Sequence, residues 1–129
     1  MHEKTVQVPT DDGVMETFIT HPEAGGPFAP VILFMDVWGV REQLRDIARQ
    51  IACVGYTVVL PNIYYRMGGE HFDSRNPDGT TASLKDLPEA DQEKIQAYRT
   101  HVSDPMAVAD TGSLMAFLAG EDAVRPGPA

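Results

Sequence analysis

A carboxylate stands directly behind the most apolar stretch of the chain. Residues 31–35 (Val-Ile-Leu-Phe-Met) are all apolar, and Asp36 follows them. A continuous apolar run without polar alternation predicts a strand that is buried on both faces of a parallel sheet. Because open α/β sheets bind ligands beyond the carboxyl ends of their strands, Asp36 stands where it could contact a substrate. The alternative is that Asp36 caps the helix that follows.

A nucleophile for acyl transfer is not evident in the sequence. The chain contains no Gly-x-Ser-x-Gly or Gly-x-Cys-x-Gly, the pattern that holds a nucleophile on a sharp turn between a strand and a helix. Gly112-Ser113 comes nearest, but it falls inside a predicted helix, and Met115 replaces the second glycine. Cys53 lies beside the apolar stripe of another predicted helix, where we expect a small buried residue.

The elements that would position Asp36 form one β-α-β unit. A helix is predicted over residues 41–54, because four apolar residues recur there at i, i+3, i+4 and i+7 spacing: Leu44, Ile47, Ala48 and Ile51. Gly55 supplies a left-handed cap at the end of this helix, and residues 56–60 form the next apolar strand.

The remaining segments predict a hairpin before this unit and two helices after it. The turn pair Asp12-Gly13 separates two β-leaning segments, which favours an antiparallel hairpin. Residues 66–89 are rich in turn residues and are expected to form a functional excursion. Helices are predicted over residues 89–102 and from Asp104, taken as the N-cap before a proline, to about Gly120.

Composition indicates one acidic globular domain. The 129 residues carry a formal net charge of −9, with 43% hydrophobic and 22% charged residues. This negative charge argues against nucleic acid or an anionic membrane surface as a partner. The sequence has no apolar run of the roughly 20 residues that span a bilayer and no secretory leader, so a cytoplasmic location is expected. We expect no metal and no cofactor, because a single cysteine and scattered histidines form no recognisable ligand set.

Three motifs resemble the N-terminal half of an enzyme family. They are Asp36-Val37-Trp38-Gly39 after the apolar run, Gly55-Tyr56, and Leu60-Pro61-Asn62-Ile63-Tyr64-Tyr65-Arg66. They are similar to the carboxylate-x-aromatic-Gly turn, the Gly-Tyr strand start and the Pro-x-Leu-Tyr-x-Arg strand end of the dienelactone hydrolase family, within the α/β-hydrolase superfamily. The late helix (residues 110–119) and Arg125-Pro126-Gly127 resemble the segment before that family's nucleophile strand.

The resemblance implies an α/β fold with a mostly parallel, α/β-hydrolase-like sheet and an N-terminal antiparallel hairpin. Residues 1–129 would be the N-terminal part of a single domain, lacking the nucleophile strand and the C-terminal half. The implied function is hydrolysis of a small-molecule carboxylic ester or lactone without a cofactor. Because the family's Cys or Ser nucleophile and its Asp and His come later, this segment alone is predicted to be inactive. The remainder of the hydrolase domain or a second copy would complete the sheet.

The resemblance also implies roles for individual residues. Asp36 falls where the family usually has Glu, a carboxylate that approaches the resting nucleophile. Val37 falls where a backbone N–H helps form the oxyanion hole, and Trp38 would wall the pocket. Arg66 and Arg75 are the predicted substrate-binding arginines, with Arg99 as a further candidate that spacing does not separate from them.

Two other kinds of function stay open at this point. The chain could be a non-catalytic remnant, or an α/β module that binds a partner through an open sheet edge. A receiver-like signalling domain is the weaker alternative. It needs an acidic pair after its first strand and a lysine that ends a late strand, whereas Asp11-Asp12 lies in the predicted hairpin turn and no such lysine occurs.

Overall fold

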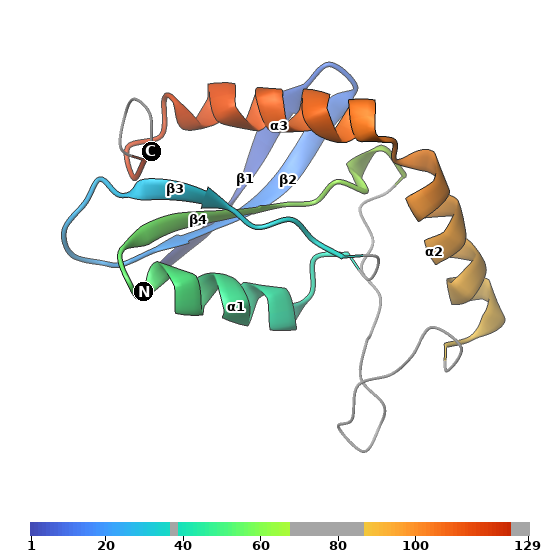
Figure 1. Cartoon of the computed structure of the whole chain (residues 1–129), viewed down its shortest axis with the longest axis horizontal. Coiled ribbons are helices and arrows are strands. Elements are labelled where there is room, and N and C mark those ends of the chain that lie inside the picture. The colour runs from blue at the N-terminus through green and yellow to red at the C-terminus, as the bar shows by residue number, and fades with distance from the viewer. Residues whose placement is uncertain (37–38, 68–86, 125–129) are drawn as a thin grey trace.

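The computed structural model describes residues 1–36, 39–67 and 87–124, in which four strands form one sheet with helices on both faces (Figure 1). The strands are β1 (His2–Thr10), β2 (Gly13–His21), β3 (Ala29–Ile32) and β4 (Tyr56–Pro61), in the spatial order β1-β2-β4-β3. β3 and β4 are parallel, whereas β1 with β2 and β2 with β4 are antiparallel. The α/β class is therefore confirmed. The expected mostly parallel arrangement is wrong for the described residues, because the second hairpin strand joins β4 in antiparallel direction and makes the sheet mixed.

The predicted hairpin is confirmed and is longer than expected. β1 and β2 pair from His2 opposite His21 to Thr10 opposite Gly13. Gly13 has a φ of +148° at this tight turn, a conformation that favours glycine. Pro9 lies inside β1 rather than ending it. β1 is the outer strand of the sheet, where a missing backbone donor is tolerated.

The predicted β-α-β unit consists of β3, α1 (Glu42–Ala52) and β4. Gly55, between α1 and β4, has the positive φ (+106°) expected of it. β3 is shorter than the predicted strand over residues 31–35, although Leu33 N–H still donates to Val59 C=O at 2.8 Å. The residues of β3 are only half-buried, because this strand is last in the sheet order and has a full strand neighbour on one edge.

Two apolar cores lie on opposite faces of the sheet, and β4 contributes to both. Val58 and Leu60 pack in the core that includes α1, whereas Val59 packs in the core that includes α3 (Asp104–Leu118). This follows from the alternation of side chains along a strand. In Figure 1, α1 and α3 lie on opposite sides of the sheet, and α2 (Glu89–His101) lies beyond the N-terminal end of α3.

The start of α3 differs from the prediction by one residue. Ser103 is the N-cap, and its Oγ accepts a hydrogen bond from Met106 N–H at 3.4 Å. Asp104, the predicted cap, is instead the first residue of the helix. Serine and aspartate are similarly good N-caps, so the sequence Ser-Asp-Pro allows either start.

Cys53 is exposed, and the expectation that it is buried is wrong. α1 ends at Ala52, and Cys53 is its C-cap, so its side chain lies past the last position that faces the core.

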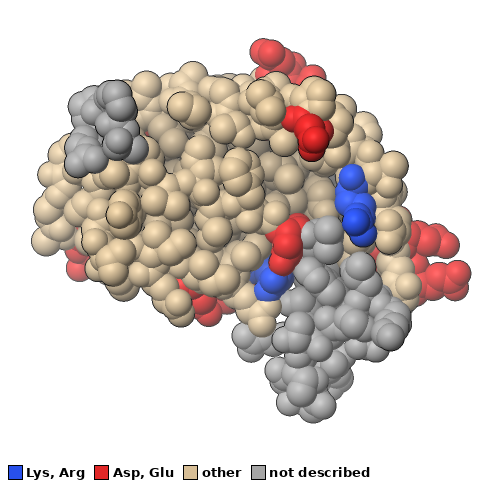
Figure 2. All heavy atoms as spheres, in the orientation of Figure 1, with Lys and Arg blue, Asp and Glu red and all other residues tan. Residues whose placement is uncertain are grey.

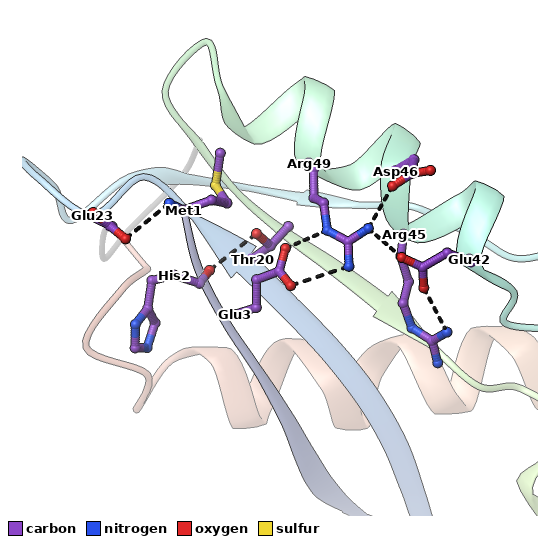
Figure 3. A network of polar contacts seen from close by, with 9 residues as sticks. All are labelled: Met1, His2, Glu3, Thr20, Glu23, Glu42, Arg45, Asp46 and Arg49. Carbon is purple, nitrogen blue, oxygen red and sulfur yellow. Dashed lines mark hydrogen bonds and ion pairs between the residues drawn. The ribbon is translucent and has the colours of Figure 1, made fainter.

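A cluster of ion pairs fastens α1 to the outer strand of the sheet (Figure 3). Arg49 Nη1 lies 2.6 Å from both Glu42 Oε1 and Asp46 Oδ1 on its own helix, and Arg49 Nη2 lies 3.2 Å from Glu3 Oε1 on β1. The guanidinium also lies 5.7 Å from the ring centre of Phe18, a cation–π contact. One arginine therefore contacts three carboxylates, offsets part of their negative charge and covers an aromatic ring of the core.

We expect Arg49→Gln to lower the free energy of unfolding by about 1 kcal/mol, as for loss of a partly exposed network. Hydrogen bonding to Arg49 lowers the pKa of Glu42 below its ordinary value of 4.5. The difference between wild type and variant should therefore be present above pH 4.5 and shrink as pH falls through the lowered pKa. Urea unfolding at fixed protein concentration, at neutral and acidic pH, measures this difference.

Arg45→Gln is the matched control, because Arg45 meets Glu42 in a single, longer contact of 3.4 Å. Equal losses in the two variants, or a pH-independent difference, would show that the cluster around Arg49 does not act as a network.

Candidate functional site

The sheet changes its winding direction at β3. α1 leads from β3 to β4 on one face, and α3 leads back across the other face (Figure 1). Along β3 and its continuation, the backbone N–H groups of odd-numbered residues point to β4, as the hydrogen bond from Leu33 to Val59 shows. The N–H of Phe28 therefore points to the opposite edge, where it donates to Ala123 C=O at 3.1 Å. Val124 forms a parallel bridge with Phe28 there. The carboxyl end of β3 is thus a topological switch point, the place where open α/β sheets bind ligands.

Asp36 lies just beyond this end of β3. Its backbone C=O accepts a hydrogen bond from Gly39 N–H at 3.1 Å, and Gly39 has a φ of +84°. Its carboxylate Oδ2 lies 2.5 Å from Arg41 Nη2, and its side chain is 41% exposed. Asp36 does not cap the helix, which was the alternative role, because α1 begins after Arg41 and has no side-chain cap. Arg41 instead connects the carboxylate to the start of α1.

Tyr64 is a site residue that the sequence reasoning did not single out. Its side chain is buried and lies 5.1 Å from Tyr98, ring centre to ring centre, in an edge contact. Burial raises the pKa of Tyr64, and the negative charge of Asp36 raises it further, while the charge of Arg99 lowers it. The phenol therefore keeps its proton near a carboxylate, as a hydrogen-bond donor does. The sequence signal that could have identified Tyr64 is its place in the motif of residues 60–66.

Arg66 lies in a buried network with α3 and the hairpin turn. Its Nη1 and Nη2 each donate to Asp110 at 2.8 Å, and its Nε donates to Asp12 at 2.7 Å. Tyr65 O–H donates to the same Asp110 carboxylate at 2.7 Å and accepts from Thr10 at 2.9 Å. The hydrogen bonds to Asp110 raise the pKa of Arg66 further above its ordinary value. The guanidinium points to Asp110 and Asp12 rather than to Asp36.

The charges of Asp36 and Arg99 thus act in opposite directions on the pKa of the buried Tyr64 phenol. Val37, Trp38 and Arg75 lie outside the described residues. In the described ranges, no group of three or more His, Cys, Asp and Glu side chains is arranged to hold a metal. None of the helices in those ranges has the length and hydropathy to cross a membrane.

Comparison with known proteins gives one consistent family. The sequence pattern of the Dienelactone hydrolase family matches residues 15–118. The chain is 26% identical over 115 residues to a "Putative carboxymethylenebutenolidase" of Methylorubrum extorquens, which covers 89% of this chain and 34% of that protein. A protein of the same description from Escherichia coli K12 is 34% identical over 77 residues, with 49% of this chain and 28% of that protein covered.

The fold has a counterpart among solved structures. The "Putative Dienelactone Hydrolase from Klebsiella pneumoniae" superposes with a TM-score of 0.69 at 22% identity, over 94% of this chain and 45% of that one. The chain therefore spans about a third of the length of the Methylorubrum relative and less than half of this solved chain.

Asp110→Asn is expected to lower the free energy of unfolding by about 3 kcal/mol, because removing one partner of a buried ion pair leaves an uncompensated charge. The side chains of Arg66 and Asp110 are only 9% and 4% exposed. Asp12→Asn is the matched control on the same guanidinium and should cost less than about 1 kcal/mol, since that carboxylate is exposed. Equal costs, measured by urea unfolding, would contradict this reading of the network.

Proposed function

Because this chain belongs to the dienelactone hydrolase family, we propose that it forms part of a hydrolase of carboxylic ester or lactone bonds in small molecules. The observation that carries the proposal is the family match over residues 15–118. The position of Asp36 at the switch point of the sheet supports it, because this is where an α/β enzyme binds its substrate.

In the proposed reaction, a thiol or hydroxyl nucleophile from the remainder of the domain attacks the carbonyl carbon of the ester. The nucleophile gives its proton to a histidine, the C–O bond breaks, and the oxygen of the leaving group takes that proton from the histidine. Water then hydrolyses the acyl intermediate, which releases the carboxylic acid and returns a proton to the nucleophile. Val37 N–H would stabilise the oxyanion. Asp36 would approach the nucleophile in the resting state, and Trp38 would wall the pocket.

Contacts of the described residues support these roles. Arg41 holds the Asp36 carboxylate at 2.5 Å, which restricts its rotation. The proton-bearing Tyr64 lies close enough to be affected by the charge of Asp36. Arg66 and Arg75 stay the proposed substrate-binding arginines. Nη1 and Nη2 of Arg66 each use one N–H to donate to Asp110. Substrate binding by Arg66 would therefore use the second N–H of either nitrogen.

We further propose that the remainder of the hydrolase domain completes the sheet along the outer edge of β3, which pairs with no full strand among the described residues. The chain already meets this edge in parallel direction at Phe28 and Val124. Two copies of β3 related by a two-fold axis would pair in antiparallel direction instead, and they would compete with Val124 for Phe28. In the view of Figure 2, little charge lies over β3 and the neighbouring half of α3, as expected of a surface that another element covers.

The chain alone is expected to show no turnover of a p-nitrophenyl ester, since it carries no nucleophile elbow. Hydrolysis should appear when the C-terminal portion of the Methylorubrum extorquens relative is supplied, covalently or as a second polypeptide. Asp36→Asn should then lower kcat/KM by at least about tenfold, whereas Glu42→Gln on the outer side of α1 should not.

Hydrolysis by the chain alone that Ser113→Ala or Cys53→Ala abolishes would overturn the assignment. An assembled but inactive complex would favour the non-catalytic alternative.

Light scattering and thermal unfolding test the completion of the sheet. With the C-terminal portion present, we expect a one-to-one complex with a higher melting temperature than the chain alone, because binding to the native state stabilises it. A homodimer of the chain alone would favour a second copy. A sharp, concentration-independent melting transition of a monomer that ignores the added portion would contradict the proposal.

A further inference from the structure

Two histidines face each other at the end of the sheet opposite Asp36. His2, at the start of β1, is the direct partner of His21, at the end of β2. Because directly opposed residues of antiparallel strands point to the same face, both imidazoles lie on one side of the sheet. Their ring centres are 4.8 Å apart, with an angle of 39° between the ring planes. Thr20 Oγ1 donates to His2 C=O at 3.1 Å and fixes the start of β1 at this register (Figure 3).

This separation allows the two imidazoles to share one metal ion. With metal–nitrogen bonds of about 2.0–2.1 Å, each ring centre lies about 3.2 Å from the ion, and ligand angles of about 90–109° place the ring centres about 4.5–5.2 Å apart. The observed 4.8 Å lies within this range.

The hydrogen bonding of His21 leaves the correct nitrogen available. Its Nδ1 lies 2.8 Å from Pro22 C=O, which can only accept, so Nδ1 carries the proton. In the neutral ring Nε2 is then a lone-pair donor. Metal-binding histidines commonly donate their other ring N–H to a backbone carbonyl in this way, which fixes both tautomer and ring orientation.

The surroundings of the pair favour a cation. The imidazoles line a hollow of about 310 Å³ whose wall also contains three carboxylates (Glu23, Glu121 and Asp122) and one basic side chain, Lys4. Lys4 is paired with Glu121 at 2.6 Å, and Glu23 lies 3.1 Å from the amine of Met1. The carboxylates therefore outnumber the basic groups, so the hollow carries a net negative charge that attracts a cation.

We propose that His2 and His21 form a binding site for a divalent late first-row transition-metal ion, the class to which Zn²⁺ belongs. Two imidazole nitrogens suit these ions, whereas Mg²⁺ and Ca²⁺ prefer oxygen ligands. Water or a carboxylate of the hollow completes the coordination. The ion joins the first residue of β1 to the last residue of β2, so its effect is to fasten the outer strand of the sheet. This site is independent of the proposed hydrolase chemistry.

Calorimetric titration of Zn²⁺ into the chain, prepared without a polyhistidine tag, tests the proposal. We expect one ion per chain, and a loss of affinity of at least about tenfold in both His2→Ala and His21→Gln. His101→Ala is the matched control, since His101 is an exposed histidine on α2, and it should bind as the wild type does. Far-UV circular dichroism checks that the variants keep their fold.

The free amine of Met1 is the competing ligand, and a Gly-Ser extension before Met1 removes it from the site. Binding that survives the extension but not His2→Ala supports the histidine pair. Binding that is lost with the extension alone, that is unchanged in His2→Ala and His21→Gln, or that is absent up to millimolar Zn²⁺ overturns the proposal. Zn²⁺ should also raise the melting temperature of the wild type and not that of His2→Ala, because the ion binds only the folded pair.

Discussion

The parallel pairing of β3 with β4 is the interaction on which the candidate site depends. It fixes β3 as a neighbour of the best-buried strand of the sheet, so the chain leaves β3 at the same edge at which it leaves β4. Asp36 follows one strand and Tyr64 follows the other, and the charge of Asp36 affects the pKa of Tyr64 although 27 residues of sequence separate them. The local partner of Asp36 is Arg41, whereas its influence on Tyr64 depends on the pairing of the two strands.

A second constraint keeps this edge of the sheet in place. Residues 62–67, directly after β4, belong to no strand, and the short 3-10 helix η1 (Tyr65–Met67) is held by side-chain contacts of Tyr65 and Arg66. Tyr65 and Arg66 both bind Asp110, which lies buried on the face of α3 that packs on the sheet. Asp110 has its charge matched by the guanidinium and its remaining lone pairs occupied by the phenol, which is the condition under which a buried ion pair is tolerated. The same pair therefore fixes the position of η1, which directly follows Tyr64.

Local pattern predicted the elements of the fold well, and tertiary contacts decided what it missed. The turn at Gly13 and the cap at Gly55 depend on neighbouring residues only, and both appear as expected. The stripe of α1 is met in part, because Leu44 and Ala48 are buried whereas Ile47 is 43% exposed. The exposure of Cys53 depends on where α1 ends, which a helical stripe does not define to one residue. The mixed sheet depends on β2 joining β4, a pairing between strands far apart in sequence.

The candidate site was predictable to a smaller extent for the same reason. Asp36 could be singled out because an apolar strand ends at it. Arg66 stood in a family-like motif, but its network with Asp110 and Asp12 joins three segments that no local pattern connects. Tyr64 became a site residue only through its proximity to Asp36. Sequence spacing indicates which residues have suitable chemistry, while the pairing of strands determines which of them meet.

The surface of α3 supports the proposal that another element covers this side of the molecule. After Pro105 the helix carries one charged residue, Asp110, and that residue is buried. Val108 and Met115 are 73% and 62% exposed. Ser113 and Ala116 lie against the hairpin turn at Pro9–Asp11, so the flank with Val108 and Met115 is turned to the opposite side, toward β3. A surface helix normally places charged residues on its outer face. Within the described residues, the exposed Val108 and Met115 and the outer edge of β3 are therefore both available to the element that the proposal adds.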